Sequence, residues 1–361
     1  MQSKSRVTGF DLARAYAIFG MFIVNFNVVF GNYHDQSFWA KTLAAFSGNS
    51  STVFVLLAGM GIALMSNRAT YTFEERKQLV GVVNKRALFL FCLGLLLYNW
   101  WPADILHFYG GYMHIGMLLL FVNKRYYLFT ASAAILVFHL LTLVLPFETG
   151  WDFETLQYLD FWTLKGFVRN TFYNGWNPIF PWLAYFMVGM YLGRLDLNSF
   201  RLRLRIFSIG FFLYSVTWGI QSWSASVPLS NAMKLFFSAD YLPPFLPFIL
   251  STMGSGLMLI TLFLQISGYV NQYRWVQLFT STGQMTLTHY LSHLLLGLPL
   301  LAFLTDSDLG FRTDKMHYVQ PQIILLFASV YFAASCLISY FWLKSFKHGP
   351  MEQLMRKFSD R

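Results

Sequence analysis

The chain is dominated by long apolar segments, of which the first is the clearest. From Phe10 to Phe30 the sequence is almost wholly apolar for 21 residues. A helix of that length, rising about 1.5 Å per residue, crosses a hydrocarbon core about 30 Å thick. Similar segments recur to the C-terminus. We expect ten membrane spans, at residues 10–30, 50–66, 86–101, 104–122, 126–145, 177–193, 205–223, 245–266, 283–304 and 319–343.

The composition supports this interpretation for the whole chain. Of its 361 residues 56% are hydrophobic and only 12% are charged, and the mean hydropathy is +0.48. A soluble domain carries about twice that share of charge. No internal repeat and no Pro/Gly/Ser-rich linker divides the sequence. We therefore predict an all-α fold, a single integral membrane domain over 1–361, in which about ten helices form a polytopic bundle around a central polar cavity.

The basic residues indicate how the bundle is oriented. The net charge is +10, but the Lys and Arg residues are scattered between apolar segments and form no aromatic-interleaved patch, which argues against a nucleic-acid partner. If the ten spans alternate, 20 of the 26 basic residues fall on one side. The positive-inside rule then places both termini in the cytoplasm and the loop that holds His34 outside.

Three polar residues interrupt the first apolar segment. At about 100° per residue, Asp11, Arg14 and Asn25 share one stripe of the helix. A polar side chain facing lipid is costly, so the stripe should face the interior of the bundle. Asp11 and Arg14 are spaced to pair with each other. A packing role and a functional role both remain open, because buried polar pairs also fasten membrane helices together.

Two further groups combine histidine with other polar residues. Asp104 and His107 are three apart, so they predict either a carboxylate–imidazole pair or a helix start with an interfacial histidine. His289 and His293 share one face of a later span. An i, i+4 pair of this kind is half a metal site, but no Glu or Cys accompanies it. We expect no metal there, and favour an interior polar face or a tunnel wall.

The longest loop predicted to lie outside covers residues 146–176. It alternates acidic and aromatic residues in the run E-T-G-W-D-F-E-T-L-Q-Y-L-D-F-W. The pattern suits stacking on sugar rings, and it also suits an amphipathic segment with Trp and Tyr at the level of the lipid headgroups.

The opening pattern carries a family resemblance. Asp11 and Arg14 are followed by Asn25, by a histidine in the next loop, and by the helix V-F-V-L-L-A-G-M-G. This order resembles the transmembrane acyltransferase superfamily, in the branch that contains the heparan-α-glucosaminide N-acetyltransferase catalytic domain and the YeiB-like membrane proteins. The resemblance extends through four later patches, D-I-L-H-F-Y-G-G-Y, P-W-L-A-Y-F-M-V-G-M-Y-L-G, G-Q-M-T-L-T-H-Y-L-S-H and H-G-P-M-E-Q-L-M-R.

The resemblance implies a multi-pass acyltransferase of the cell's inner, cytoplasmic membrane. It implies that an acyl group, most simply acetyl, passes from cytoplasmic acyl-CoA to a hydroxyl or amine of an extracytoplasmic saccharide or envelope metabolite. His34 would be the base or transient acyl carrier, and Asn25 its partner or an oxyanion donor. Supporting roles at the site are expected for Asp11, Arg14, Asp104, His107, His289 and His293. The phosphates of CoA are expected to bind Arg14, Lys85, Arg86 and Arg194.

Other functions fit the same sequence. A secondary transporter or flippase would use buried Asp11, Arg14, Asp104 and the histidines as a proton or substrate path. The absence of an inverted repeat weighs against it. A receptor-like or scaffold protein without turnover is a third interpretation. The basic residues at the cytoplasmic ends of spans are also explained by topology alone, and a homodimer is left open.

Overall fold

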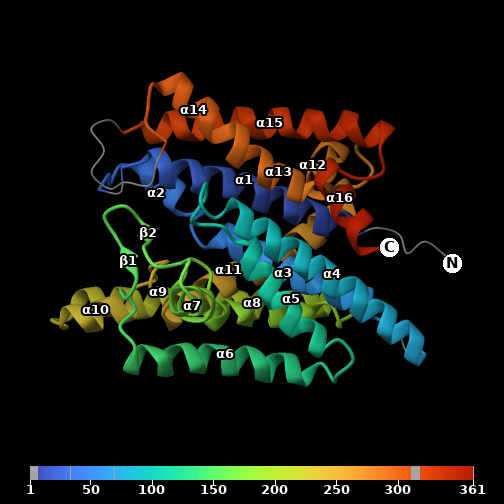
Figure 1. Cartoon of the computed structure of the whole chain (residues 1–361), viewed down its shortest axis with the longest axis horizontal. Coiled ribbons are helices and arrows are strands. Elements are labelled where there is room, and N and C mark those ends of the chain that lie inside the picture. The colour runs from blue at the N-terminus through green and yellow to red at the C-terminus, as the bar shows by residue number, and fades with distance from the viewer. Residues whose placement is uncertain (1–6, 33, 69, 310–317, 361) are drawn as a thin grey trace. The chain divides into compact units, whose positions relative to one another are not determined.

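The computed structural model describes residues 7–32, 34–68, 70–309 and 318–360, which are overwhelmingly helical (Figure 1). Within this part of the chain the only strands are β1 (Trp151–Asp152) and β2 (Gln157–Tyr158), which pair antiparallel. The predicted all-α fold class is confirmed.

The chain divides into two compact units. Unit 1 is made of the described residues within Met1–Phe54, Phe200–Gly210 and Ser255–Leu354. Unit 2 is made of those within Val55–Ser199, Phe211–Gly254 and Met355–Arg361. Four helices contribute residues to both units: α3 (Asn49–Met65), α9 (Phe200–Ser226), α11 (Leu246–Val270) and α16 (Pro350–Ser359).

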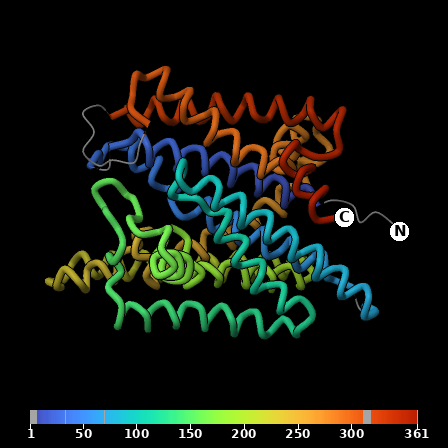
Figure 2. The backbone as a smooth tube through the Cα atoms, viewed as in Figure 1, coloured from blue at the N-terminus to red at the C-terminus, as the bar shows by residue number. Residues whose placement is uncertain are grey.

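Helix α1 (Thr8–Phe30) is the central element of unit 1. It packs against α2 (Phe38–Ala44), α12 (Val276–Gln284), α13 (Thr286–Ser292) and α15 (Pro321–Ser345), and Figure 2 shows α1 and α15 running side by side. Contact with α12 is so close that a Cβ on Gly283 would lie 2.0 Å from the Asp11 carbonyl oxygen. Only glycine allows the two backbones to approach in this way.

The span expected at 283–304 is a broken helix. Helix α12 ends at Gln284, and Met285 has non-helical backbone angles (φ −115°, ψ 38°). The chain continues as α13, the π-helical turn η2 (His293–Gly297) and α14 (Leu298–Thr305). A break inside a membrane helix needs partners for the freed backbone groups. The Glu352 carboxylate accepts hydrogen bonds from the amides of Leu287 and Thr288, at 2.6 and 3.1 Å.

Unit 2 is built on two helix pairs. Helix α4 (Phe73–Leu97) packs on α5 (Leu106–Leu118), and α6 (Arg125–Val144) packs on α8 (Ile179–Leu192). The remaining elements are η1 (Asn170–Asn174), another π-helical turn, and the short helices α7 (Leu164–Arg169) and α10 (Asn231–Phe237).

Helix α4 starts well before the span expected at 86–101. The Thr72 hydroxyl accepts a bond from the Glu75 amide, and the Glu75 carboxylate accepts one from the Thr72 amide. This reciprocal capping box satisfies two of the backbone donors that open a helix. The helix therefore extends through a charged segment before its apolar part begins.

Seven helical segments in the described residues are long and apolar enough to cross a membrane. The segments expected at 104–122 and 177–193 are also helical, but α5 and α8 have only 13 and 14 residues. The span expected at 205–223 lies inside α9, which has 27 residues. The seven are Thr8–Phe30, Phe38–Met65, Phe73–Leu97, Arg125–Val144, Leu246–Val270, Thr286–Thr305 and Pro321–Ser345.

Candidate functional site

The polar stripe of α1 begins with an ion pair. Arg14 Nη1 lies 2.8 Å from Asp11 Oδ1, and the Asp11 side chain is buried while that of Arg14 is partly exposed. The sequence predicted this pairing from the spacing. The Arg14 guanidinium assigned to a CoA phosphate is therefore already engaged with a carboxylate, and its phosphate role stays a prediction.

The deeper end of the stripe meets a histidine from a distant part of the chain. Asn25 Nδ2 lies 2.8 Å from His293 Nε2, and the imidazole is completely buried. His293 Nδ1 lies 3.1 Å from the His289 carbonyl oxygen. Because a carbonyl oxygen only accepts, Nδ1 carries the proton and Nε2 accepts from the Asn25 amide. The contact fixes both the tautomer and the ring orientation.

Aromatic rings enclose the His293 imidazole. Phe22 and Phe26 of α1 lie at centroid distances of 5.2 and 6.2 Å, and Tyr290 lies at 5.5 Å. The histidine begins the π-helical turn η2, and such turns are frequent at functional sites. The Nε2 lone pair thus accepts one amide hydrogen bond in a buried, largely aromatic surrounding.

His289, one turn earlier, uses a different partner. Its Nε2 lies 2.6 Å from Ser339 Oγ on α15, and both side chains are buried. The sequence placed His289 and His293 on one face, but it gave no signal for Ser339 or for Glu352, whose contacts join segments dozens of residues apart. Among the described residues, no group of three or more His, Cys, Asp or Glu side chains is arranged to hold a metal ion.

His34 belongs to a different part of the chain from the Asn25–His293 pair. Its side chain is exposed in the loop between α1 and α2, and its backbone amide donates to Asn32 Oδ1 at 2.9 Å. The structure pairs the Asn25 amide with His293, not with His34. The role of His34 stays a prediction, while His293 gains a direct link to the α1 stripe.

In unit 2, Asp104 and His107 form a second buried pair. One carboxylate oxygen, Oδ2, lies 3.0 Å from both the His107 amide nitrogen and His107 Nδ1, and both side chains are fully buried. Asp104 thus satisfies an amide in the first turn of α5 and holds the imidazole at once. A Cβ on Gly94 of α4 would lie 2.3 Å from the same oxygen. Among the described residues, His107 Nε2 has no hydrogen-bond partner.

The loop at residues 146–176 contributes an aromatic ring that packs near this pair. Phe161 stacks on Tyr98 at a centroid distance of 3.4 Å, and both rings lie 5.9 Å from the His107 ring. Trp151 and Tyr158 of the same loop are buried, whereas Trp162 is 62% exposed. Most of the aromatic residues in the alternating pattern therefore build the core of the loop.

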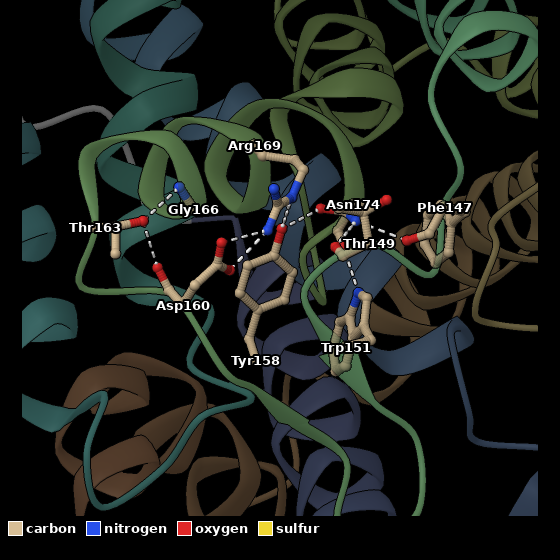
Figure 3. Close-up of polar contacts among 9 residues, drawn as sticks. All are labelled: Phe147, Thr149, Trp151, Tyr158, Asp160, Thr163, Gly166, Arg169 and Asn174. Carbon is tan, nitrogen blue, oxygen red and sulfur yellow. Dashed lines mark hydrogen bonds and ion pairs between the residues drawn. The ribbon is translucent and has the colours of Figure 1, made fainter.

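A polar network holds the loop in shape (Figure 3). Arg169 Nη2 contacts both oxygens of Asp160, at 2.6 and 2.8 Å, and Arg169 Nε donates to the Tyr158 hydroxyl. That hydroxyl donates to Asn174, whose amide donates to the Phe147 carbonyl. Burial raises the pKa of the Tyr158 phenol to about 12, while the Arg169 contact acts in the opposite direction. The phenol therefore stays protonated and can donate at neutral pH.

Three other basic residues were assigned to CoA phosphates. Arg86 binds the C-terminal segment, with Nη2 3.1 Å from Asp360 Oδ1 and Nε 3.2 Å from Ser359 Oγ. Arg194 donates to oxygens of Ser66 and Leu120. Lys85 is half-buried. The phosphate roles of all three stay predictions.

These features define a class, that of multi-pass all-α membrane proteins with buried imidazoles held by amide and carboxylate partners. Residues 6–209 match the family model described as heparan-alpha-glucosaminide N-acetyltransferase, catalytic. That range is more than half of the chain, so the chain belongs to this family of membrane acetyltransferases. Residues 197–361 match a second model, described as a protein of unknown function (DUF418). The suspected superfamily is thereby confirmed. No curated protein matches the chain.

Proposed function

We propose that this protein is a membrane acyltransferase that takes an acyl group, most simply acetyl, from cytoplasmic acyl-CoA. The acceptor is a hydroxyl or amine of an extracytoplasmic saccharide or envelope metabolite. Family membership supports the reaction class. The single structural observation that carries the proposal is the contact between Asn25 and His293, because it holds an oriented imidazole from η2 against a fixed donor on the opening helix α1.

The chemistry requires a base and an oxyanion donor. The acceptor oxygen or nitrogen attacks the thioester carbonyl carbon, and its proton passes to an imidazole. The C–S bond then breaks, and the leaving CoA thiolate takes that proton to become the thiol. We assign the base to His34, which is exposed on the predicted outer side. An Asn side chain has two N–H donors. One of the two on Asn25 orients His293, and we assign the other to the developing oxyanion.

The test is thiol release from acetyl-CoA by purified protein in nanodiscs, with and without glucosamine as the acceptor probe. We expect His34→Ala to lower the rate by about a hundredfold or more, the usual effect of losing a general base. Lys41→Ala is the matched control, since Lys41 is exposed nearby on α2 and has no assigned role. A fully active His34→Ala variant beside an inactive His293→Ala variant would move the base to His293.

One observation favours the alternative of a transporter. The break at Met285 divides a membrane helix, and discontinuous helices form the substrate sites of many secondary transporters. Counterflow of labelled glucosamine into liposomes that lack acyl-CoA would support transport. Absence of counterflow together with thiol release would exclude it for this substrate.

A further inference from the structure

Unit 2 contains a cationic pocket of about 370 Å³. Its walls come from the segment after α3, the first turns of α4, the segment that links α5 to α6, and the end of α8. The volume lies in the range of small-molecule sites. The lining residues include four cations and no carboxylate: Ser66, Arg68, Tyr71, Arg76, Leu120, Phe121, Val122, Asn123, Lys124 and Arg194.

Arg194 gives the pocket a fixed wall. Its Nη2 donates to Ser66 Oγ and to the Leu120 carbonyl oxygen, at 2.6 and 2.7 Å, and its Nη1 donates to the Ser66 carbonyl oxygen. The guanidinium thus joins the ends of three elements. All of these acceptors are neutral, so the bonds orient the charge without cancelling it.

Two more arginines are held by aromatic rings. The Arg76 guanidinium lies 5.1 Å from the centre of the Phe121 ring, and that of Arg68 lies 5.5 Å from the Tyr71 ring. Such contacts stabilise a cation while leaving its charge in place. Arg68 also pairs with Glu75 at 2.7 Å. Arg76, Lys124 and Arg194 therefore supply most of the uncompensated positive charge.

We propose that this pocket binds a phosphate-bearing group with two or more negative charges, a phosphomonoester or a diphosphate. Guanidinium groups recognise phosphate oxygens bidentately, and several cations in one small volume match a multiply charged anion. All four segments are on the side that the Lys and Arg distribution predicts to be cytoplasmic. Two sources share this chemistry, the nucleotide end of CoA and the headgroup of an anionic phospholipid. The first rests on the proposed function, and the second does not.

The decisive variants are Arg76→Gln and Lys124→Gln, with Lys77→Gln and Arg125→Gln as matched controls that neighbour them in sequence but do not line the pocket. Binding of inorganic pyrophosphate to the full-length protein in detergent is measured by calorimetry. We expect each pocket variant to weaken binding by about tenfold, the effect of losing one charge-assisted contact, and both controls to bind like wild type. Equal affinity in wild type and the Arg76→Gln/Lys124→Gln double variant would overturn the proposal.

Competition then distinguishes the two sources. Displacement of pyrophosphate by CoA, weaker for 3′-dephospho-CoA, supports the nucleotide. Displacement by phosphatidic acid in nanodiscs, without an effect of phosphatidylcholine, supports the lipid headgroup. Pyrophosphate binding that persists in a protein without thiol release keeps the phosphate site and rejects the acyltransferase. Thiol release without pyrophosphate binding keeps the acyltransferase and rejects the phosphate site.

Discussion

His293 in unit 1 and His107 in unit 2 are both completely buried, yet their ring nitrogens have different partners. Each donates its Nδ1 proton to an oxygen on its own segment, the His289 carbonyl in one case and the Asp104 carboxylate in the other. A carboxylate stabilises the imidazolium that forms when a proton is taken, whereas a carbonyl does so far less. The Nδ1 of His107 therefore has a carboxylate partner, and that of His293 a neutral carbonyl partner.

The Nε2 atoms differ in the same sense. His293 Nε2 is occupied by the amide of Asn25, while His107 Nε2 has no hydrogen-bond partner among the described residues and lies among the rings of Tyr98 and Phe161. Burial alone thus says little about what a histidine does. The identity of each nitrogen's partner decides it.

The largest expected effect tests the carboxylate–imidazole pair. Asp104→Ala removes the acceptor of two buried donors, the His107 amide and Nδ1. Leaving buried donors unpaired is costly, so we expect a loss of about 3 kcal/mol in the free energy of unfolding. The measurement is detergent-solubilised thermal unfolding followed by tryptophan fluorescence.

Asp240→Ala is the matched control for Asp104→Ala. Asp240 is an exposed carboxylate in the same unit, and substitutions at such positions change stability by about 0.5 kcal/mol or less. If the two variants lose the same stability, the pair contributes nothing specific, and the contrast with His293 loses its basis.

The next largest effect on stability is expected when the Asn25–His293 pair is changed into a carboxylate–imidazole pair, like that of Asp104 and His107. In Asn25→Asp a carboxylate faces the His293 Nε2 lone pair, and neither group donates while the imidazole is neutral. We expect a loss of about 1 to 2 kcal/mol at pH 8. Thermal unfolding of the detergent-solubilised protein at pH 8, followed by tryptophan fluorescence, measures it.

Asn27→Asp serves as the control for Asn25→Asp, because Asn27 is also half-buried and lies only two residues further along α1. It should lose less stability than Asn25→Asp. An equal loss in the two variants would mean that the Asn25 amide is not acting as the donor to His293.

Local spacing predicted the contacts within one helix and missed those between distant segments. The Asp11–Arg14 and Asp104–His107 pairs follow from a separation of three residues, and both are present. The partner of Asn25 lies 268 positions away, and no periodicity connects the two. The early start of α4 was recoverable, since Thr72 and Glu75 have the spacing of a capping box. The break at Met285 was not, because neither glycine nor proline marks that position.

The smallest effect concerns the segment that carries His293. Glu352→Gln removes the carboxylate charge, so the bonds from the amides of Leu287 and Thr288 become weaker neutral ones. The Thr288 hydroxyl can no longer donate to the oxygen that becomes an amide NH₂. We expect a loss of about 1 kcal/mol, as for other helix N-terminal caps, with Gln353→Ala on the exposed side of α16 as the neutral control.

Hydrogen exchange shows whether this loss reaches only one of the two histidines. In Glu352→Gln the amides of α13 should exchange faster, because the carboxylate that satisfies the opening turn of that helix is weakened. The amides of α5, which carries His107, should keep their wild-type rates, since Asp104 and not Glu352 accepts from an amide in its first turn. Equal acceleration in both helices would mean that the two imidazoles belong to one cooperative unfolding unit. The two histidines would then differ in their hydrogen-bond partners but not in the stability of the segments that carry them.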